Sequence, residues 1–288
     1  MKSLALWPEC DAARIRGVFT DIDDTLTTDG VITPEALIAL SALKAAGLIV
    51  IPITGRPIGW CQAFLDGTHG MPLPVDAMVA ENGAVAFVRG NRAPNTNAAL
   101  PEFVKRYKED GATRAAHAAR LAEIAKQVAA EVPGAALSRD SAERETDIAF
   151  DYAEFACLPK EMVRQVLKVL QRSGLHTTVS SIHIHGCFGN VDKWQGARWI
   201  VREYMQRDLS RELADWVFVG DSGNDQAMFQ HFTNSVGVAN IARFVPELQN
   251  LPRYITREER GAGFAEVAQA ILAARRVKQP MMAHCQIT

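Results

Sequence analysis

Two aspartates two positions apart, Asp21 and Asp23, follow a short apolar segment at Val18–Thr20. In an extended chain, residues i and i+2 point to the same side, so these carboxylates would lie together where a buried strand ends. Two like charges at close range are costly unless a cation or a shared proton offsets them. The pair therefore predicts a metal site, an acid/base pair or both. A solvated Asp-rich turn is the plain alternative.

Later segments carry residues that could complete such a site. They are Thr54, Gly55 and Arg56 after an apolar run at 48–53, the lysine Lys193, and Asp221, Asn224 and Asp225 after an apolar run at 216–219. Because the carboxyl ends of parallel strands meet at one edge of a sheet, we expect these side chains to converge. A solvated turn, or the Asp-x-Asp with which some glycosyltransferases hold a metal and a nucleotide-sugar, would leave the later residues unexplained.

The chemistry of the assembled residues is that of phosphoryl transfer. A carboxylate that attacks a phosphate dianion faces charge repulsion, which Mg²⁺ held by oxygen ligands would offset. Asp21 and Asp221 are the expected ligands. The Thr54 hydroxyl and the Lys193 ammonium would hold phosphate oxygens and neutralise developing charge. Asp23 could protonate the leaving oxygen and later activate water.

The segments around these residues alternate between apolar strands and helices. Thr33 and Pro34 predict the N-cap and first turn of a helix, and Gly47 predicts its end. The order β-α-β-α-β over residues 1–88 predicts a parallel sheet with helices on both faces, and the same pattern returns over 188–288. We expect these two parts to form one Rossmann-like α/β core.

The intervening segment, 89–187, is predicted to be an inserted α+β domain. Its polar stretch at 91–97 predicts a linker or loop. Further predictions are a helix at 113–132, a strand at 148–152, a helix at 160–172, and one or two strands at 175–188. The alternation of polar and apolar residues in the last segment predicts an antiparallel sheet with one wet face.

Composition and charge set further limits. A net charge of −2 over 288 residues gives no support for a nucleic-acid or membrane-surface partner. The apolar stretch Leu4–Trp7 is too short for a secretory signal, and no run approaches transmembrane length. Five widely spaced cysteines without Cys-x-x-Cys favour reduced thiols. We therefore expect a cytoplasmic protein and make no prediction of its oligomeric state.

The motif residues, taken in order, resemble the four motifs of the haloacid dehalogenase (HAD) superfamily of phosphohydrolases. The matching segments are 21–25, Thr54, Lys193 and 220–225. The insert resembles the type IIB cap of the Cof-like phosphatases, of the sucrose-, trehalose- and mannosylglycerate-phosphate phosphatases, and of phosphomannomutase. Such a cap implies that the insert governs the choice of substrate.

The resemblance also implies roles for individual residues. Asp21 would be the nucleophile that forms an aspartyl-phosphate, with Asp23 as general acid/base. Mg²⁺ would bind to the Asp21 side chain, the Asp23 backbone carbonyl and Asp221, with Asp225 nearby. The phosphoryl group would be held by Thr54, Gly55, Lys193 and Asn224.

One departure from this pattern concerns the lysine. In this branch the lysine is usually followed directly by glycine, whereas Lys193 is followed by Trp194-Gln195-Gly196. Lys193 is assigned by elimination, since no other lysine lies between Lys168 and Lys278.

Two histidines and a cysteine, His183, His185 and Cys187, share one face of a predicted strand. Strand residues at i and i+4 are about 13 Å apart, so all three cannot bind one zinc ion. We expect this face of the insert to look into the substrate cavity or into solvent.

Three arginines are weaker candidates for substrate binding. Arg139 and Arg144 could hold a second anionic group of a substrate, with a solvated loop as the alternative. Arg56 could orient the site or form an ion pair within the core.

These observations predict a Mg²⁺-dependent phosphatase that acts through an aspartyl-phosphate on a small phosphorylated metabolite, with a sugar phosphate as the preferred choice. A phosphomutase would use the same nucleophile but return the phosphoryl group to the substrate. A non-catalytic binding module is the remaining alternative, and it would be expected to lack at least one of the motif residues.

Overall fold

The computed structural model describes residues 1–68, 70–90 and 103–283. A six-stranded sheet in the order β1-β15-β14-β13-β2-β5 forms its core, and every neighbouring pair in it is parallel. The strands are β1 (Lys2–Ser3), β2 (Gly17–Thr20), β5 (Ile49–Pro52), β13 (Trp216–Gly220), β14 (Ser235–Gly237) and β15 (Tyr254–Ile255). The predicted α/β fold class is thereby confirmed.

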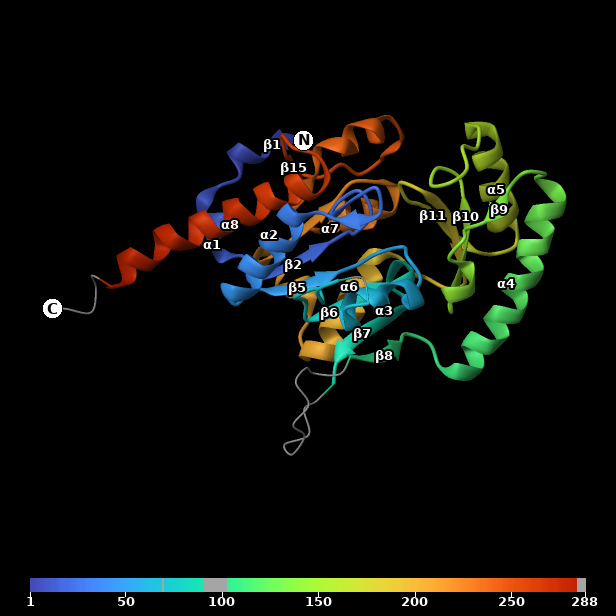
Figure 1. Cartoon of the computed structure of the whole chain (residues 1–288), viewed down its shortest axis with the longest axis horizontal. Coiled ribbons are helices and arrows are strands. Elements are labelled where there is room, and N and C mark those ends of the chain that lie inside the picture. Colours follow the sequence, from blue (N-terminus) through green and yellow to red (C-terminus); the bar gives the residue numbers. More distant parts are fainter. Residues whose placement is uncertain (69, 91–102, 284–288) are drawn as a thin grey trace.

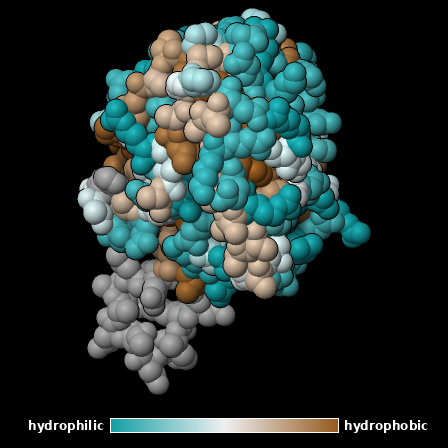
Figure 2. Space-filling view, turned by 90° about the vertical axis from the view of Figure 1, so that its right-hand side faces the viewer, coloured by the Kyte–Doolittle hydropathy of each residue, from teal (hydrophilic) through white to brown (hydrophobic). Residues whose placement is uncertain are grey.

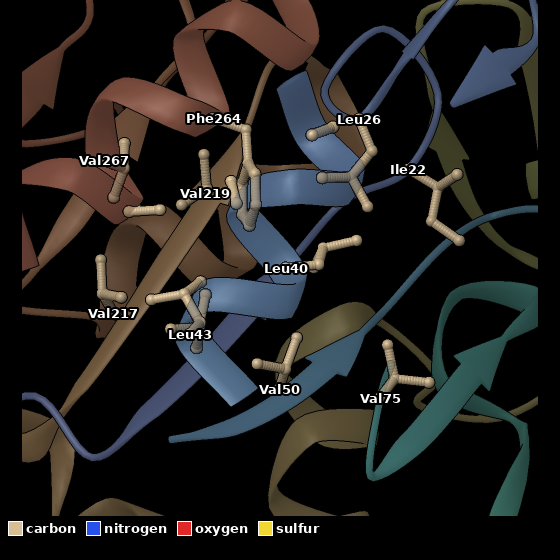
Figure 3. Close-up of a cluster of buried hydrophobic side chains, with 14 of the residues drawn as sticks. Ile22, Leu26, Leu40, Leu43, Val50, Val75, Val217, Val219, Phe264 and Val267 are labelled. Carbon is tan, nitrogen blue, oxygen red and sulfur yellow. The ribbon is translucent and has the colours of Figure 1, made fainter. Parts of the chain in front are cut away.

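Helices cover both faces of this sheet. On one face lie α1 (Glu9–Arg14), α2 (Pro34–Ala45) and α8 (Arg260–Ala283), and on the other lie α6 (Lys193–Met205) and α7 (Gln226–His231). Figure 3 shows the first layer, where Leu40 of α2 and Phe264 of α8 pack over the strand residues Val50 and Val219. Because both faces are covered, β2 and β13 are buried along their whole length, as their continuous apolar sequences predict.

The helix α2 begins where its capping residues predict. The Thr33 hydroxyl oxygen accepts a hydrogen bond from the backbone N–H of Ala36 at 3.2 Å, and Pro34 is the first helical residue. Gly47 follows the end of the helix with a φ of +77°, a conformation that glycine adopts without strain. A short hairpin of β3 (Thr27–Thr28) and β4 (Val31–Ile32) connects β2 to this helix.

A second sheet extends the core beyond β5. It contains β6 (Ala77–Ala80), β7 (Val85–Arg89) and β8 (Phe103–Tyr107), all antiparallel, and is covered by α3 (Ile58–Asp66). A parallel bridge between Ile53 and Val79 joins it to the main sheet. The strand β7 pairs antiparallel with β6 and does not join the parallel sheet. The three-residue connection at 81–83 has positive φ throughout and is far too short for a parallel crossover.

The inserted segment forms a separate layer at one end of the core (Figure 1). Its antiparallel sheet has the order β11-β12-β10-β9 and is covered on one face by two helices. The elements are α4 (Gly111–Glu131), β9 (Ala136–Leu137), β10 (Asp147–Asp151), α5 (Lys160–Arg172), β11 (His176–Val179) and β12 (His183–Cys187). The strand β8 lies within the predicted insert but pairs with β7, and the predicted loop at 91–97 falls outside the described residues.

The surface at the insert end is mainly hydrophilic, with hydrophobic residues in small scattered groups (Figure 2). No helix in the described part of the chain is long and apolar enough to span a membrane. The described cysteines Cys10, Cys61, Cys157 and Cys187 are free thiols.

Two residues of α2 allow a matched test of the core. Leu40 is fully buried, whereas Ile38 on the same helix is 69% exposed. We expect Leu40→Ala to lower the free energy of unfolding by about 2–5 kcal/mol, because it removes apolar contacts and leaves a cavity. Ile38→Ala should change it by less than about 1 kcal/mol. Urea unfolding of both variants is the measurement, and equal losses would contradict this packing.

Candidate active site

The carboxyl ends of three neighbouring strands place the motif residues side by side. Asp21 follows β2, Asp221 follows β13 and Thr54 lies just beyond β5. All three are buried, with Asp21 at 4% exposure and the other two at 0%. The predicted convergence at one sheet edge is therefore what the topology produces.

A buried cluster of charges occupies this edge. Lys193 Nζ lies 2.6 Å from Asp21 Oδ1 and 2.7 Å from Asp225 Oδ1. Carboxylate oxygens of Asp21, Asp221 and Asp225 lie within 4.8 Å of one another. Burial raises the pKa of Asp21 and of Asp221 well above the usual range, and the neighbouring carboxylates add to this, while Lys193 opposes it at Asp21. Burial alone would lower the pKa of Lys193, but its two carboxylate partners outweigh it and raise that pKa.

This cluster fits a divalent cation. Three buried carboxylates face a single buried ammonium group, and Asp221 Oδ1 has no hydrogen-bond partner among the described residues. A buried, unpartnered carboxylate oxygen is costly, and hard oxygen ligands are those that Mg²⁺ prefers. Asp225 already accepts hydrogen bonds from Lys193 and from the backbone N–H groups of Asp221 and Ser222. Asp21 and Asp221 are therefore the more available side-chain ligands.

Gly196, which lies in the same helix as Lys193, has a packing role. Lys193 is the first residue of α6, and the Asp192 side chain caps this helix by accepting from the Gln195 N–H at 2.7 Å. One turn along, a Cβ atom on Gly196 would lie 2.4 Å from the Cα of Gly83. The glycine thus lets α6 approach the 81–83 turn closely, and Lys193 reaches the carboxylates although its neighbour in sequence is Trp194.

Thr54 and Asn224, two of the predicted phosphate-binding residues, make hydrogen bonds within the core. Thr54 Oγ1 accepts from the Arg56 N–H at 3.1 Å, which leaves its own O–H free to donate. Asn224 Nδ2 donates to Asn82 Oδ1 at 2.9 Å. Asn82 was not predicted from the sequence. The sequence feature that indicates a tight turn here is the Asn-Gly pair at 82–83, since asparagine and glycine are the residues that most readily adopt positive φ.

Arg56 joins the core to the insert. Its Nε lies 3.0 Å from both oxygens of Asp23, and its Nη2 lies 2.8 Å from Asp23 Oδ1 and 2.7 Å from Glu154 Oε1 of the insert. A longer contact of 3.4 Å reaches Asp140. Arg56 therefore forms the predicted ion pair with Asp23 of the core, and it also pairs with carboxylates of the insert.

Arg144 does not lie in a solvated loop. Its guanidinium is 2% exposed, donates to the Gly55 carbonyl at 3.0 Å, and is paired with Asp147 at 2.9 Å and Asp140 at 3.3 Å. These partners accept hydrogen bonds from the Arg144 guanidinium, so the geometry does not favour its predicted binding to a second anionic group of a substrate. Arg139 is exposed, and its guanidinium stacks over the Phe155 ring at 3.8 Å.

Glu81 is a further contact between core and insert that sequence reasoning missed. It is fully buried and accepts from the backbone N–H groups of Ile58, at 3.1 Å, and of Thr146, at 2.6 Å. It also accepts from the Glu145 N–H and the Thr146 hydroxyl. The side chain thus fixes the start of β10 against the core.

A narrow pocket opens between core and insert. It is lined by Asp21, Asp23, Gly55, Arg56 and Asn224 of the core and by Ser180, Ser181, Ile182, His183 and His185 of the insert. His183 and His185 are 1% and 3% exposed. The sequence left open whether these histidines face a cavity or solvent. In the structure both line the pocket.

Comparison with known proteins agrees with this geometry. The family described as haloacid dehalogenase-like hydrolases matches residues 18–267. A phosphoglycolate phosphatase of Methanothermobacter thermautotrophicus is 24% identical over 261 residues, which are 90% of this chain and 99% of that protein.

Solved structures share the fold. The sucrose-phosphatase from Synechocystis sp. PCC6803, determined with sucrose and phosphate, superposes with a TM-score of 0.61 at 14% identity and covers 88% of this chain and 97% of its own. The HAD subclass IIB sugar phosphatase BT4131 gives 0.58 at 17% identity, covering 90% and 98%.

The chain belongs to the haloacid dehalogenase-like hydrolases, and its fold is that of the subclass with a type IIB cap. This confirms the resemblance inferred from the motifs and the expected enzyme class, a phosphoric monoester hydrolase.

The two arginines of the insert allow a paired test of the contact with the core. We expect Arg144→Met to lower the free energy of unfolding by about 3 kcal/mol or more, because Asp140 and Asp147 would keep buried charges without their partner. Arg139→Met, at an exposed position nearby, should cost less than about 1 kcal/mol. Denaturant unfolding distinguishes them, and a harmless Arg144→Met would show that this guanidinium is dispensable.

Proposed function

We propose that the protein is a Mg²⁺-dependent phosphatase that hydrolyses a sugar phosphate through an aspartyl-phosphate on Asp21. The observation that carries this proposal is the buried cluster of Asp21, Asp221 and Lys193, in which a nucleophile, a metal ligand and a phosphate-binding cation meet at one edge of the sheet.

In the first step, the transfer of the phosphoryl group to Asp21, each residue has a separate role. Asp21 attacks the phosphorus atom, and the bond from phosphorus to the leaving oxygen breaks. Thr54 donates its hydroxyl hydrogen to a phosphate oxygen, while Lys193 and Asn224 hold the others. Mg²⁺, held by Asp21, Asp221 and the Asp23 backbone carbonyl, supplies positive charge that offsets repulsion between carboxylate and phosphate.

Asp23 is the proposed acid and base. It lines the pocket beside Asp21, where it would give a proton to the leaving oxygen and then take one from the water that hydrolyses the aspartyl-phosphate. Arg56 engages both oxygens of Asp23, so one of these contacts must open during the cycle. The same arginine holds Glu154 of the insert, which supports coupling between the insert and the acid/base group.

The insert is the proposed determinant of substrate choice. It supplies half of the residues that line the pocket, and most of these are polar and uncharged. Sugar phosphatases share the fold, and the sucrose-phosphatase carried sucrose and phosphate. A phosphoglycolate phosphatase is also a relative, so phosphoglycolate is the competing substrate. The cytoplasmic location remains our proposal, supported by the free thiols among the described cysteines.

Replacement of the nucleophile tests the mechanism. Asp21→Asn nearly preserves shape while removing the attacking oxygen, so phosphate release should fall below about 1% of the wild-type rate, with an unchanged circular dichroism spectrum. Asp29→Asn, an exposed control on the β3–β4 hairpin, should retain full activity. Substantial turnover by Asp21→Asn would exclude Asp21 as the nucleophile.

Metal binding can be tested without an activity assay. Mg²⁺ should raise the thermal midpoint of the wild type, with a stabilisation of about 2.7 kcal/mol at 100 times its Kd. Asp221→Asn should abolish this shift. Without metal, the variant should be at least as stable as the wild type, because burial and the neighbouring carboxylates disfavour the charged form of Asp221, and its Oδ1 has no hydrogen-bond partner among the described residues. An undiminished Mg²⁺ shift in the variant would place the metal elsewhere, and Asp29→Asn serves again as the control.

A further inference from the structure

The face of the insert above the pocket contains two buried polar atoms that lack hydrogen-bond partners among the described residues. They are His185 Nε2, on β12, and Ser181 Oγ, in the turn before it. The two residues are 3% and 7% exposed, and both line the pocket. Leaving a buried polar group unpaired is costly, so native proteins usually satisfy such groups with a residue, a water molecule or a ligand. Neither atom is needed by the proposed chemistry at Asp21.

The surroundings of His185 determine which hydrogen bond it can make. Its Nδ1 lies 3.2 Å from Asp147 Oδ2, and the same carboxylate is paired with Arg144 at 2.9 Å. Although burial acts in the opposite direction, Arg144 and His185 hold the pKa of Asp147 below its usual range. Asp147 is therefore an ionised acceptor, and Nδ1 carries the ring hydrogen.

The other ring nitrogen is consequently an acceptor. Burial lowers the pKa of His185 to about 4, with Arg144 adding to this effect and Asp147 opposing it, so the ring is neutral at pH 7. A neutral imidazole that donates from Nδ1 accepts at Nε2. Ser181 can donate or accept. The pair is thus suited to a group that itself carries a hydrogen on oxygen.

The acceptor atom, His185 Nε2, lies close to the proposed reaction centre. Nε2 lies 2.9 Å from where a Cβ atom on Gly55 would be, and Asn224 Nδ2 lies 3.3 Å from the same point. The absence of a side chain at Gly55 therefore lets the insert come close to the segment between Thr54 and Arg56. A group bound at His185 would sit next to the phosphate-binding side chains.

We propose that His185 and Ser181 form a subsite that hydrogen-bonds a hydroxyl group on the leaving part of the substrate. The inference rests on the proposed phosphatase function and deepens it, because it names the substrate class as phosphate monoesters of polyhydroxylated compounds. His183, whose Nε2 lies 2.9 Å from Glu154, forms an adjoining polar wall that already has its partner.

The same surroundings disfavour an anionic leaving group. Arg56 is the cation that lines the described pocket, and it is already paired with Asp23, Asp140 and Glu154. A carboxylate such as that of phosphoglycolate would meet a lone pair at His185 Nε2 and no uncommitted cation among these lining residues. The subsite therefore separates hydroxylated substrates from phosphoglycolate.

The experiment compares substrates with and without hydroxyl groups in the presence of Mg²⁺. Wild type, Ser181→Ala and His185→Phe are assayed with a set of sugar and polyol phosphates, with phosphoglycolate, and with p-nitrophenyl phosphate, whose leaving group has no hydroxyl substituent beyond the ester oxygen. We expect each variant to lose about 3- to 10-fold in kcat/KM for the preferred sugar phosphate, the effect of one lost hydrogen bond. Hydrolysis of p-nitrophenyl phosphate should fall by a clearly smaller factor than that of the preferred sugar phosphate in each variant.

Two controls keep the result specific. His176→Phe makes the same replacement at an exposed position on the neighbouring strand β11 and should leave all substrates unaffected. A deoxy analogue of the preferred sugar phosphate that lacks the bound hydroxyl should be hydrolysed equally by wild type and Ser181→Ala. Ser181→Ala also supplies the answer if His185→Phe fails to fold.

Several outcomes would overturn the subsite. They are an equal loss on p-nitrophenyl phosphate, no loss on the sugar phosphate, or a wild type that hydrolyses p-nitrophenyl phosphate and phosphoglycolate but no hydroxylated ester. In the first two cases only the subsite fails. In the third case phosphatase activity stands, but the proposed sugar-phosphate substrate fails together with the subsite. A folded wild type that releases phosphate from no ester would instead refute the proposed function itself.

Discussion

The structure depends most on the burial of more negative than positive charge at the edge of the main sheet. Asp21, Asp221 and Asp225 meet there with Lys193 as the single buried ammonium group. Such an arrangement is unfavourable for an isolated protein, since burial disfavours each charged carboxyl and each carboxylate disfavours the next. In the function that we propose, a bound divalent cation and a phosphoryl group would offset this cost, and the unfavourable free state would thereby favour their binding.

The same constraint explains the architecture around the cluster. The parallel order of β5, β2 and β13 brings three strand ends to one place, and the glycine contact between α6 and the 81–83 turn brings Lys193 to them. Gly220 contributes in a similar way, because a Cβ there would lie 2.4 Å from Asp225 Oδ2. Close packing at glycine positions therefore holds the charged groups at short range, where water cannot screen them.

A second layer of charges joins the insert to this site. Arg56 of the core binds carboxylates of the insert, and Glu81 of the core accepts hydrogen bonds from the insert backbone. Arg144 of the insert donates to the Gly55 carbonyl, so the segment that follows Thr54 is tied to the loop before β10. These contacts are polar, while a small apolar cluster of Ala84, Cys187 and Val191 also joins the insert to the core.

Much of the fold and the centre of the site followed from the sequence, for identifiable reasons. Local signals marked the strands at Val18 and Trp216, the capped start of α2, and the carboxylates after the strands. Lys193 could be found because it has no competing lysine nearby.

What could not be predicted depended on contacts between distant segments. The hydrogen bond from Arg144 to the Gly55 carbonyl joins residues 89 positions apart in the sequence. Glu81 reads as an ordinary turn residue until β10 is seen above it. His185 was placed on the correct strand face, but its free Nε2 emerges only from the position of Asp147.

The most direct test of the central claim is to look for the covalent intermediate. The enzyme is mixed with Mg²⁺ and an excess of a phosphate ester that it hydrolyses, quenched in acid within the first turnovers, and digested for mass spectrometry. Our account predicts one phosphoryl group on the peptide that contains Asp21, assigned to that residue by fragmentation and lost when the substrate is exhausted. Steady release of phosphate with no phosphoryl group on Asp21 at any quench time would contradict it.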